Sequence, residues 1–327
     1  MLSFSRLALN KKLTMPAIDL IQIGPLAPHL NATLQQQHGA AALWEQDDWP
    51  AWLREHGAQA RVVVTSARHG CSAAVIDALP QLAAIVSFGV GYDSIALDAA
   101  RARGIQVSNT PDVLNDCVAD LAFGLMIDAA RGISHGDRFV RAGRWHQGPF
   151  PLTSRVSGKR LGILGLGRIG EKVARRAQGF DMEVAYNNRR PREGAPWRHE
   201  PDLLALAAWA DFLVVTCVGG PETEGLVSRQ VIEALGPKGV LVNVARGSVI
   251  DEDAMVEALR DGRLGAAGLD VFRDEPRVPP ALTELDNVVL APHMASGTVE
   301  TRGAMQALML DNLRAFLDTG KVLTPIL

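Results

Sequence analysis

An apolar strand that runs directly into a glycine-rich turn constrains this chain more than any other stretch. The sequence RLGILGLGRIG ends at Gly170 and contains Gly165 and Gly167, which gives the G-x-G-x-x-G spacing. The first glycine permits a tight turn, the second lets backbone approach a phosphate, and the third lets a helix pack closely on the strand. Glycine-rich turns also occur for purely steric reasons, but here the flanks match the context that a dinucleotide site requires. We therefore expect the pyrophosphate of a dinucleotide to bind at the start of the following helix, at Arg168 and Ile169.

The residues that follow the next expected strand, 183–187, indicate which dinucleotide binds. An acidic residue about 20 residues beyond the glycines usually binds the ribose 2′-hydroxyl of NAD. This chain has Asn188 there, followed by Arg189, Arg190 and, after a proline, Arg192. Guanidinium groups suit a 2′-phosphate, although a solvated basic loop is the alternative interpretation. The sequence therefore favours NADPH, with NADH as a second cofactor.

Strand-like and helical runs alternate on both sides of a long apolar helix expected at residues 113–131. The strands expected before it predict a small parallel sheet: 19–23, 62–65, 83–87 and 105–108. Those expected after it follow the rhythm of a doubly wound nucleotide domain: 161–164, 183–187, 212–216, 240–243, 267–270 and 288–290. The last helical run, 301–318, has no sheet of its own, so we expect it to return to the first domain.

Length and composition are those of a globular protein with two domains. The chain has 327 residues, of which 47% are hydrophobic and 21% charged, and its formal net charge is -3. This charge gives no general attraction to nucleic acid or to an anionic membrane, so small molecules are the expected partners. Cys71, Cys117 and Cys217 show neither zinc-binding nor disulfide spacing, which fits a reducing cytoplasm, and no metal is expected. We interpret the first 14 or so residues as a frayed tail, with Met15 as an alternative start.

Polar side chains follow the last three expected strands, at the edge of the sheet where open α/β folds bind ligands. His293 can serve as a proton donor, because imidazole titrates near neutrality. Glu275 can bond the second ring nitrogen and stabilise the imidazolium. Arg246 offers a planar fork for a keto oxygen and a carboxylate at once. The alternatives are a core histidine, a solvated loop acid and a surface ion pair.

Together these motifs resemble the D-isomer-specific 2-hydroxyacid dehydrogenases, and within them the glyoxylate and hydroxypyruvate reductases most. The match runs from about Ile18 to the C-terminus and rests on motifs in the family's order: 165–170, 243–247, 269–272 with 275–276, and 292–293. The resemblance implies an α/β fold of two doubly wound parallel-sheet domains. A Rossmann nucleotide-binding domain, 112–296, is then inserted into a discontinuous flavodoxin-like substrate domain, 1–111 and 297–327.

The resemblance also implies roles for individual residues. Arg246, Glu275 and His293 become the catalytic residues of an NAD(P)-dependent dehydrogenase that reduces a small 2-keto acid to the D-2-hydroxy acid. The backbone N–H groups of Val90 and Gly91 bind the substrate carboxylate. Further residues are expected to contact the cofactor: Cys217, Val244, Ala245, Asp270 (at the nicotinamide carboxamide) and His293.

Three further residues have two interpretations each. Arg68 and His69 follow an expected strand end and could line the pocket, although a solvated turn is equally consistent with the sequence. Trp145 matches a tryptophan that reaches the partner's active site in a homodimer, or else belongs to the local core. The alternatives for function are a phosphoglycerate dehydrogenase-type enzyme and a non-enzymatic, nucleotide-sensing corepressor-like protein.

Overall fold

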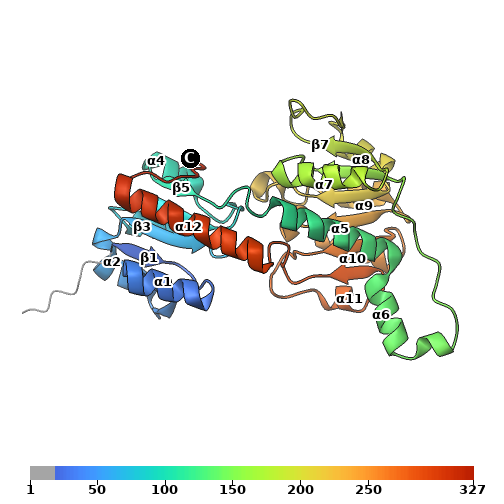
Figure 1. Cartoon of the computed structure of the whole chain (residues 1–327), viewed down its shortest axis with the longest axis horizontal. Helices are drawn as coiled ribbons and strands as arrows, with labels where there is room; N and C mark the ends of the chain where they lie inside the picture. Colours follow the sequence, from blue (N-terminus) through green and yellow to red (C-terminus); the bar gives the residue numbers. More distant parts are fainter. Residues whose placement is uncertain (1–18) are drawn as a thin grey trace, which may run out of the picture. The chain divides into compact units, whose positions relative to one another are not determined.

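Buried apolar runs form two parallel sheets, each in a unit of its own (Figure 1). The computed structural model describes residues 19–327. Unit 1 comprises the described residues up to Phe88, together with Ile95–Ser108 and Asn312–Leu327, and unit 2 comprises Gly89–Ser94 and Asn109–Asp311. The expected N-terminal tail and Met15 lie outside the described residues. The division expected at residues 111 and 296 stays a prediction about how the chain divides functionally.

Unit 1 has five parallel strands in the order β2-β1-β3-β4-β5, which is the flavodoxin-like order. The strands are β1 (Leu20–Gln22), β2 (Ala41–Ala42), β3 (Val62–Ser66), β4 (Ala84–Phe88) and β5 (Gln106–Ser108). The helices are α1 (Pro28–His38), α2 (Trp49–His56), α3 (Ala73–Ala78) and α4 (Leu97–Ala102), with short 3-10 turns η1 (Leu43–Glu45) and η2 (Gly57–Gln59). Every residue of β3 is buried, as expected of a strand covered on both faces.

Unit 2 has seven parallel strands in the order β12-β11-β10-β9-β6-β7-β8. The strands are β6 (Arg160–Leu164), β7 (Glu183–Asn187), β8 (Arg198–His199), β9 (Phe212–Val215), β10 (Val240–Asn243), β11 (Ala266–Leu269) and β12 (Val288–Leu290). The first six along the chain have the Rossmann order, and β12 extends the sheet at one edge. The expected fold class, two doubly wound parallel-sheet domains, is confirmed.

Unit 2 has two helices before its first strand, β6, and five more between its later strands. They are α5 (Asn115–Arg131), α6 (Ile133–Arg141), α7 (Arg168–Gln178), α8 (Leu203–Trp209), α9 (Arg229–Leu235), α10 (Glu252–Arg260) and α11 (Pro280–Thr283), with 3-10 turns η3 (Arg144–His146), η4 (Pro221–Thr223) and η5 (Gly247–Val249). The helix α12 (Val299–Thr319) begins in unit 2 and ends in unit 1. After it, Gln106 of β5 donates a hydrogen bond to Gly320 O at 2.7 Å and accepts one from Val322 N at 3.1 Å, which ties the C-terminal segment to the first sheet.

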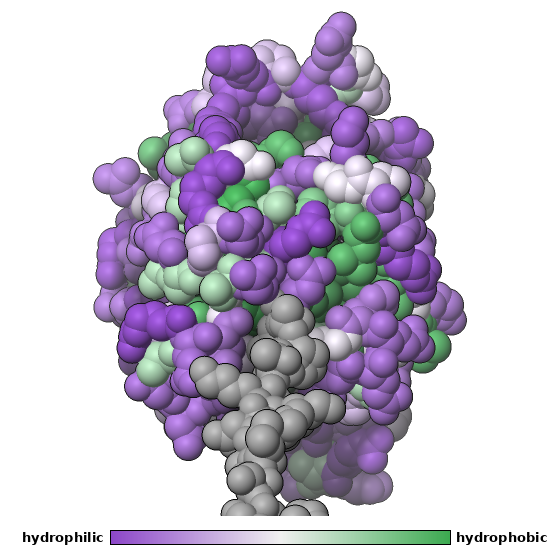
Figure 2. Space-filling view, turned by 90° about the vertical axis from the view of Figure 1, so that its left-hand side faces the viewer, coloured by the Kyte–Doolittle hydropathy of each residue, from purple (hydrophilic) through white to green (hydrophobic). Residues whose placement is uncertain are grey.

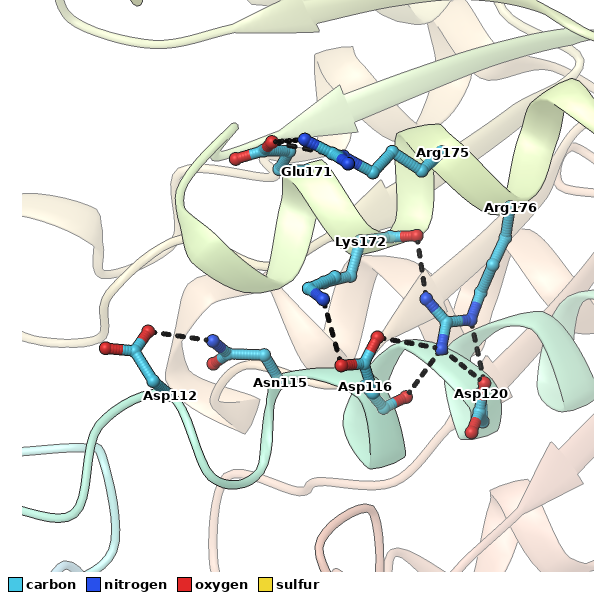
Figure 3. Close-up of polar contacts among 8 residues, drawn as sticks. All are labelled: Asp112, Asn115, Asp116, Asp120, Glu171, Lys172, Arg175 and Arg176. Atoms are coloured by element: carbon cyan, nitrogen blue, oxygen red, sulfur yellow. Dashed lines mark hydrogen bonds and ion pairs between the residues drawn. The ribbon is translucent and has the colours of Figure 1, made fainter.

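Opposite charges at one-turn spacing hold α5 against α7, the helix that opens at the glycine turn (Figure 3). Asp116 pairs with Lys172 at 2.9 Å and with Arg176 at 3.2 Å, and Arg176 also pairs with Asp120 at 2.7 Å. Hydrogen bonding from Lys172, aided by Arg176, lowers the pKa of Asp116. These residues are partly exposed, so each pair adds at most about 1 kcal/mol, and their number and shared spacing fix the relative position of the helices.

Most of the buried side chains are apolar. In the face seen in Figure 2, hydrophilic side chains predominate and hydrophobic ones show in separate patches. Within residues 19–327, no helix combines the length and apolar character needed to cross a membrane.

Truncation of Leu213, a fully buried residue in the centre of the seven-stranded sheet, tests this core. We expect Leu213→Ala to lower the free energy of unfolding of unit 2 by about 2 to 5 kcal/mol, because it leaves a cavity between the sheet and its helices. The control Leu204→Ala, at a position 41% exposed, should cost less than about 0.5 kcal/mol. Urea denaturation followed by circular dichroism measures both, and equal losses would contradict this placement of the core.

Candidate active site

The glycine turn after β6 satisfies two kinds of steric demand. A Cβ at Gly165, whose φ is 97°, would lie 2.5 Å from the Cα of Cys217, and a Cβ at Gly170 would lie 2.4 Å from Gly165 O. A Cβ at Gly167 would have no described atom within 4 Å. The outer glycines are therefore required by the packing of the protein itself, whereas the middle one keeps an open surface that backbone presents to a ligand. This surface fits the pyrophosphate of a dinucleotide.

The helix α7 adds electrostatic preference to this surface. It begins at Arg168, and no side chain of the described residues caps its N-terminal N–H groups. Such groups and the helix dipole favour an anion. The Arg168 side chain pairs with Asp112 at 3.1 Å, and both are well exposed. Ile169 lies in the first turn of the helix.

The basic run after β7 divides into residues that shape the turn and residues that face outward. Asn188 accepts a hydrogen bond from Leu166 N at 2.7 Å. Arg192 donates one to Gly167 O at 2.7 Å and pairs with Glu171 of α7. These two side chains are therefore committed to the geometry of the glycine turn.

The two remaining arginines of the run stay accessible. Arg189 pairs with Glu222 of η4 at 2.5 Å, with exposed fractions of 87% and 77% for the two side chains. Arg190 is exposed, and within residues 19–327 no ion pair is recorded for it. These are the two side chains of the run that could meet a 2′-phosphate without dismantling the turn.

Arg246 stands on a short loop after β10 that Asn243 holds. The Asn243 side chain donates a hydrogen bond to Arg246 O at 2.8 Å and accepts one from Ala245 N at 3.0 Å. A Cβ at Gly247 would lie 1.9 Å from the carbonyl carbon of Phe272, so only glycine lets this loop contact the loop after β11. The loop of Arg246 and the loop of Glu275 are therefore packed backbone to backbone.

Asp93 fixes the guanidinium of Arg246, a contact that the sequence analysis missed. The Nε of Arg246 donates to both carboxylate oxygens of Asp93, at 3.2 and 3.1 Å, and its Nη1 donates to Ala245 O at 2.8 Å. A Cβ at Gly91 would lie 1.6 Å from the Nη2 of Arg246, so the glycine loop and the guanidinium approach closely. The Val90 carbonyl accepts a hydrogen bond from Asn109 at 2.9 Å, which anchors that loop.

The buried carboxylate of Asp270 shapes the turn that carries His293. Its oxygens accept hydrogen bonds from Met294 N at 2.7 Å and Ala295 N at 2.9 Å, and its carbonyl accepts one from His293 N at 2.8 Å. Burial raises the pKa of Asp270 despite these N–H donors. His293 itself has a positive φ of 51°, which this network holds in place. Asp270 is fully buried and faces backbone, and its contact with a nicotinamide carboxamide stays a prediction.

His293 and Glu275 form a close pair. His293 Nδ1 lies 2.6 Å from Glu275 Oε2, and Glu275 Oε1 accepts a hydrogen bond from Phe272 N at 3.1 Å. Burial raises the pKa of Glu275, but the hydrogen bond and charge of His293, the Phe272 N–H and the charge of Arg246 outweigh it and lower the pKa. Glu275 is therefore a carboxylate near neutral pH, and it accepts a hydrogen bond from Nδ1, which leaves Nε2 to face a ligand.

The other expected residues have the following positions. Val244 and Ala245 are buried, and Cys217 lies against Gly165, where burial raises its pKa to about 11. Arg68 and His69 belong to unit 1, and their role in the site stays a prediction.

Burial and the charge of Arg68 lower the pKa of His69, whose Nδ1 lies 2.9 Å from Ser66 Oγ. Trp145, in η3, is 66% exposed, so it does not belong to the local core.

The parallel sheet of unit 2 carries a dinucleotide-binding turn, and the same edge carries an arginine and a histidine–carboxylate pair. This combination defines a nicotinamide-dependent oxidoreductase. Residues 123–295 match the model of the D-isomer specific 2-hydroxyacid dehydrogenase NAD binding domain. The chain belongs to this family.

Similar proteins cover nearly the whole chain. A hydroxyphenylpyruvate reductase of Plectranthus scutellarioides is 45% identical over 312 residues, which is 95% of this chain and 100% of that protein. A glyoxylate/hydroxypyruvate reductase A of Arabidopsis thaliana is 43% identical over 312 residues, again 95% of this chain and 100% of that protein. The crystal structure of an NADPH-dependent glyoxylate/hydroxypyruvate reductase of Sinorhizobium meliloti, in complex with NADP and malonate, has a TM-score of 0.88 and 41% identity, covering 95% of this chain and 97% of that one.

Alanine substitutions in the glycine turn separate ligand contact from folding. We expect Gly167→Ala to leave the melting temperature of the ligand-free protein unchanged but to weaken dinucleotide binding about tenfold or more, because the new methyl group occupies the surface that the pyrophosphate needs. Gly165→Ala should lower the melting temperature, because it meets the backbone of Cys217 at a positive φ. Thermal melts and calorimetric titration with NADP⁺ measure both. Normal binding by Gly167→Ala would place the dinucleotide elsewhere.

Proposed function

We propose that this chain is an NADPH-preferring reductase of small 2-keto acids, of the glyoxylate/hydroxypyruvate type, that produces D-2-hydroxy acids. The observation that carries the proposal is the 2.6 Å contact between His293 and Glu275, at the same sheet edge as Arg246 and the glycine turn. The names of the relatives, reductases of hydroxyphenylpyruvate and of glyoxylate and hydroxypyruvate, support this substrate class.

Each residue of the cluster has one task in this reaction. A nicotinamide bound at this edge would supply the hydride that reduces the keto carbon. His293 donates a proton from Nε2 to the keto oxygen, and Glu275 stabilises the imidazolium and orients the ring through Nδ1. Arg246 offers Nη2 to the substrate, because Asp93 occupies Nε and Ala245 O binds Nη1. The N–H groups of Val90 and Gly91 bind the carboxylate.

Some of the cofactor-site residues are proposed to contact the cofactor directly, and others position the residues that do. Arg189 and Arg190 are proposed to bind the 2′-phosphate, and Asn188 acts by holding the glycine turn. Other residues are proposed to contact the cofactor at the strand ends and the helix start: Gly165, Gly167, Arg168, Ile169, Cys217, Val244, Ala245, Asp270 and His293. Residues 112–296 are then proposed as the nucleotide-binding domain, and residues 1–111 with 297–327 as the substrate-binding domain, to which Arg68 contributes.

A homodimer is proposed from the exposed apolar side chains on the segment that projects from unit 2 at α6 and η3 (Figure 1). Ile133, Val140, Trp145 and Leu152 are 57%, 53%, 66% and 102% exposed. Such a concentration of apolar side chains suits an interface with Trp145 as its anchor. A cytoplasmic location is proposed on the three free thiols.

Removal of the proton donor tests the mechanism. His293→Ala is expected to lower turnover with glyoxylate or hydroxypyruvate and NADPH by roughly 100- to 10,000-fold, the range for loss of a general acid. Binding of NADPH, measured by fluorescence titration, should persist. The control His29→Ala, at an exposed position of unit 1, should retain full turnover. Full activity of His293→Ala would rule out this residue as the acid.

Removal of Arg189 tests the cofactor preference. Arg189→Ala should raise the Michaelis constant for NADPH by roughly tenfold while changing that for NADH much less, because a charged hydrogen bond to the phosphate is lost. The exposed Lys238→Ala removes the same charge elsewhere and serves as control. Equal effects of Arg189→Ala on both cofactors would remove this residue from phosphate recognition.

A further inference from the structure

The arginine that is proposed to recognise the 2′-phosphate, Arg189, forms an ion pair with an acidic side chain, Glu222. Arg189 follows β7, and Glu222 lies in the loop after β9. The strand β6 lies between β7 and β9 in the sheet. The 2.5 Å contact between Arg189 Nη1 and Glu222 Oε2 therefore joins the two loops that flank the glycine turn.

The loop that carries Glu222 has a defined structure. Thr223 Oγ1 donates a hydrogen bond to Val218 O at 2.8 Å, and Gly220 has a φ of 129° that favours glycine. A Cβ at Gly219 would lie 2.5 Å from the Cγ of Arg246, so the start of the loop packs on the arginine of the active site. Glu222 is therefore presented from an anchored loop.

Within the described residues, the side chain of Glu222 pairs with Arg189, and the two other polar residues nearby that could compete for it are already bonded. Asn188 is bonded to the turn, and Arg192 is bonded to Gly167 O and Glu171. Both partners of the Arg189–Glu222 pair are well exposed, so the pair is weak and can exchange with a ligand.

We propose that Glu222 is a cofactor-discriminating residue that competes with the 2′-phosphate for Arg189 and thereby allows the enzyme to use NADH as well as NADPH. This inference rests on the proposed role of Arg189 in NADPH binding. A 2′-phosphate must displace the carboxylate from Arg189 and is repelled by it. A 2′-hydroxyl can instead donate a hydrogen bond to Glu222 while the ion pair stays intact, which is the function of the ribose-binding acid in NAD-specific domains.

Calorimetric titrations of the ligand-free protein test this directly. The ligands are NADP⁺, NAD⁺, and the half-site probes adenosine 2′-monophosphate and adenosine. Glu222→Gln removes the charge at nearly constant shape, and Glu224→Gln, two residues along, is the matched control. We expect Glu222→Gln to tighten binding of NADP⁺ and adenosine 2′-monophosphate about three- to tenfold at low salt, and to leave NAD⁺ binding unchanged or weaker. Glu224→Gln should leave the ratio of the two dinucleotide affinities as it is in the parent protein.

The double variant Arg189→Ala/Glu222→Gln decides whether Glu222 acts through the arginine. The gain in NADP⁺ affinity should largely disappear when Arg189 is already absent. If Arg189→Ala weakens NADP⁺ selectively but Glu222→Gln leaves the affinity ratio unchanged, the competition is overturned and the NADPH preference stands. If Arg189→Ala weakens both dinucleotides equally, the proposed phosphate site fails, and the competition fails with it.

Discussion

The buried carboxylate of Asp270 fixes the turn on which the rest of the active site depends. Its two oxygens accept the N–H groups of Met294 and Ala295, and its own carbonyl accepts that of His293. His293 is thereby held at a positive φ, with its ring against Glu275. Asp270 and Glu275 follow β11, and His293 follows β12, the neighbouring strand. The register between these two strands therefore sets the position of the proton donor.

The same strategy recurs at the other strand ends. Asn243 holds the loop of Arg246, and Asp93 holds its guanidinium. At the glycine turn, Asn188 and Arg192 hold the backbone at Leu166 and Gly167. In each place a polar side chain satisfies loop backbone or another side chain, so the groups left for ligands are few and fixed in direction. The helix α7 gains a further constraint from its ion pairs with α5.

Much of the fold follows from the sequence because most of the strands are apolar runs that are largely buried. The expected strands at 62–65 and 240–243 lie within one residue of β3 and β10. The strands β2 and β8 were missed: they have two residues each, too few for a hydrophobic period, and Arg198–His199 is polar. Their pairing depends on the neighbouring strand already being in place.

The site was predictable where a motif carries its own chemistry, and less so where a contact joins distant segments. The glycine turn and the His293–Glu275 pair are of the first kind. The contact between Asp93 and Arg246 joins residues 153 positions apart, so no local sequence pattern predicts it. The position of Arg192 in the basic run suggested that it faces a phosphate. In the structure its guanidinium is bonded within the turn, because the Gly167 carbonyl and the Glu171 carboxylate lie beside it.

The pH dependence of single-turnover hydride transfer, compared between the parent protein and Glu275→Gln, tests the central claim most directly. A proton donor oriented by a carboxylate predicts that the rate of keto acid reduction falls as the pH rises, and that Glu275→Gln lowers the rate, because the ring loses the ionised partner that holds Nδ1. A rate that stays flat from about pH 6 to about pH 10, or identical profiles for both proteins, would contradict the account.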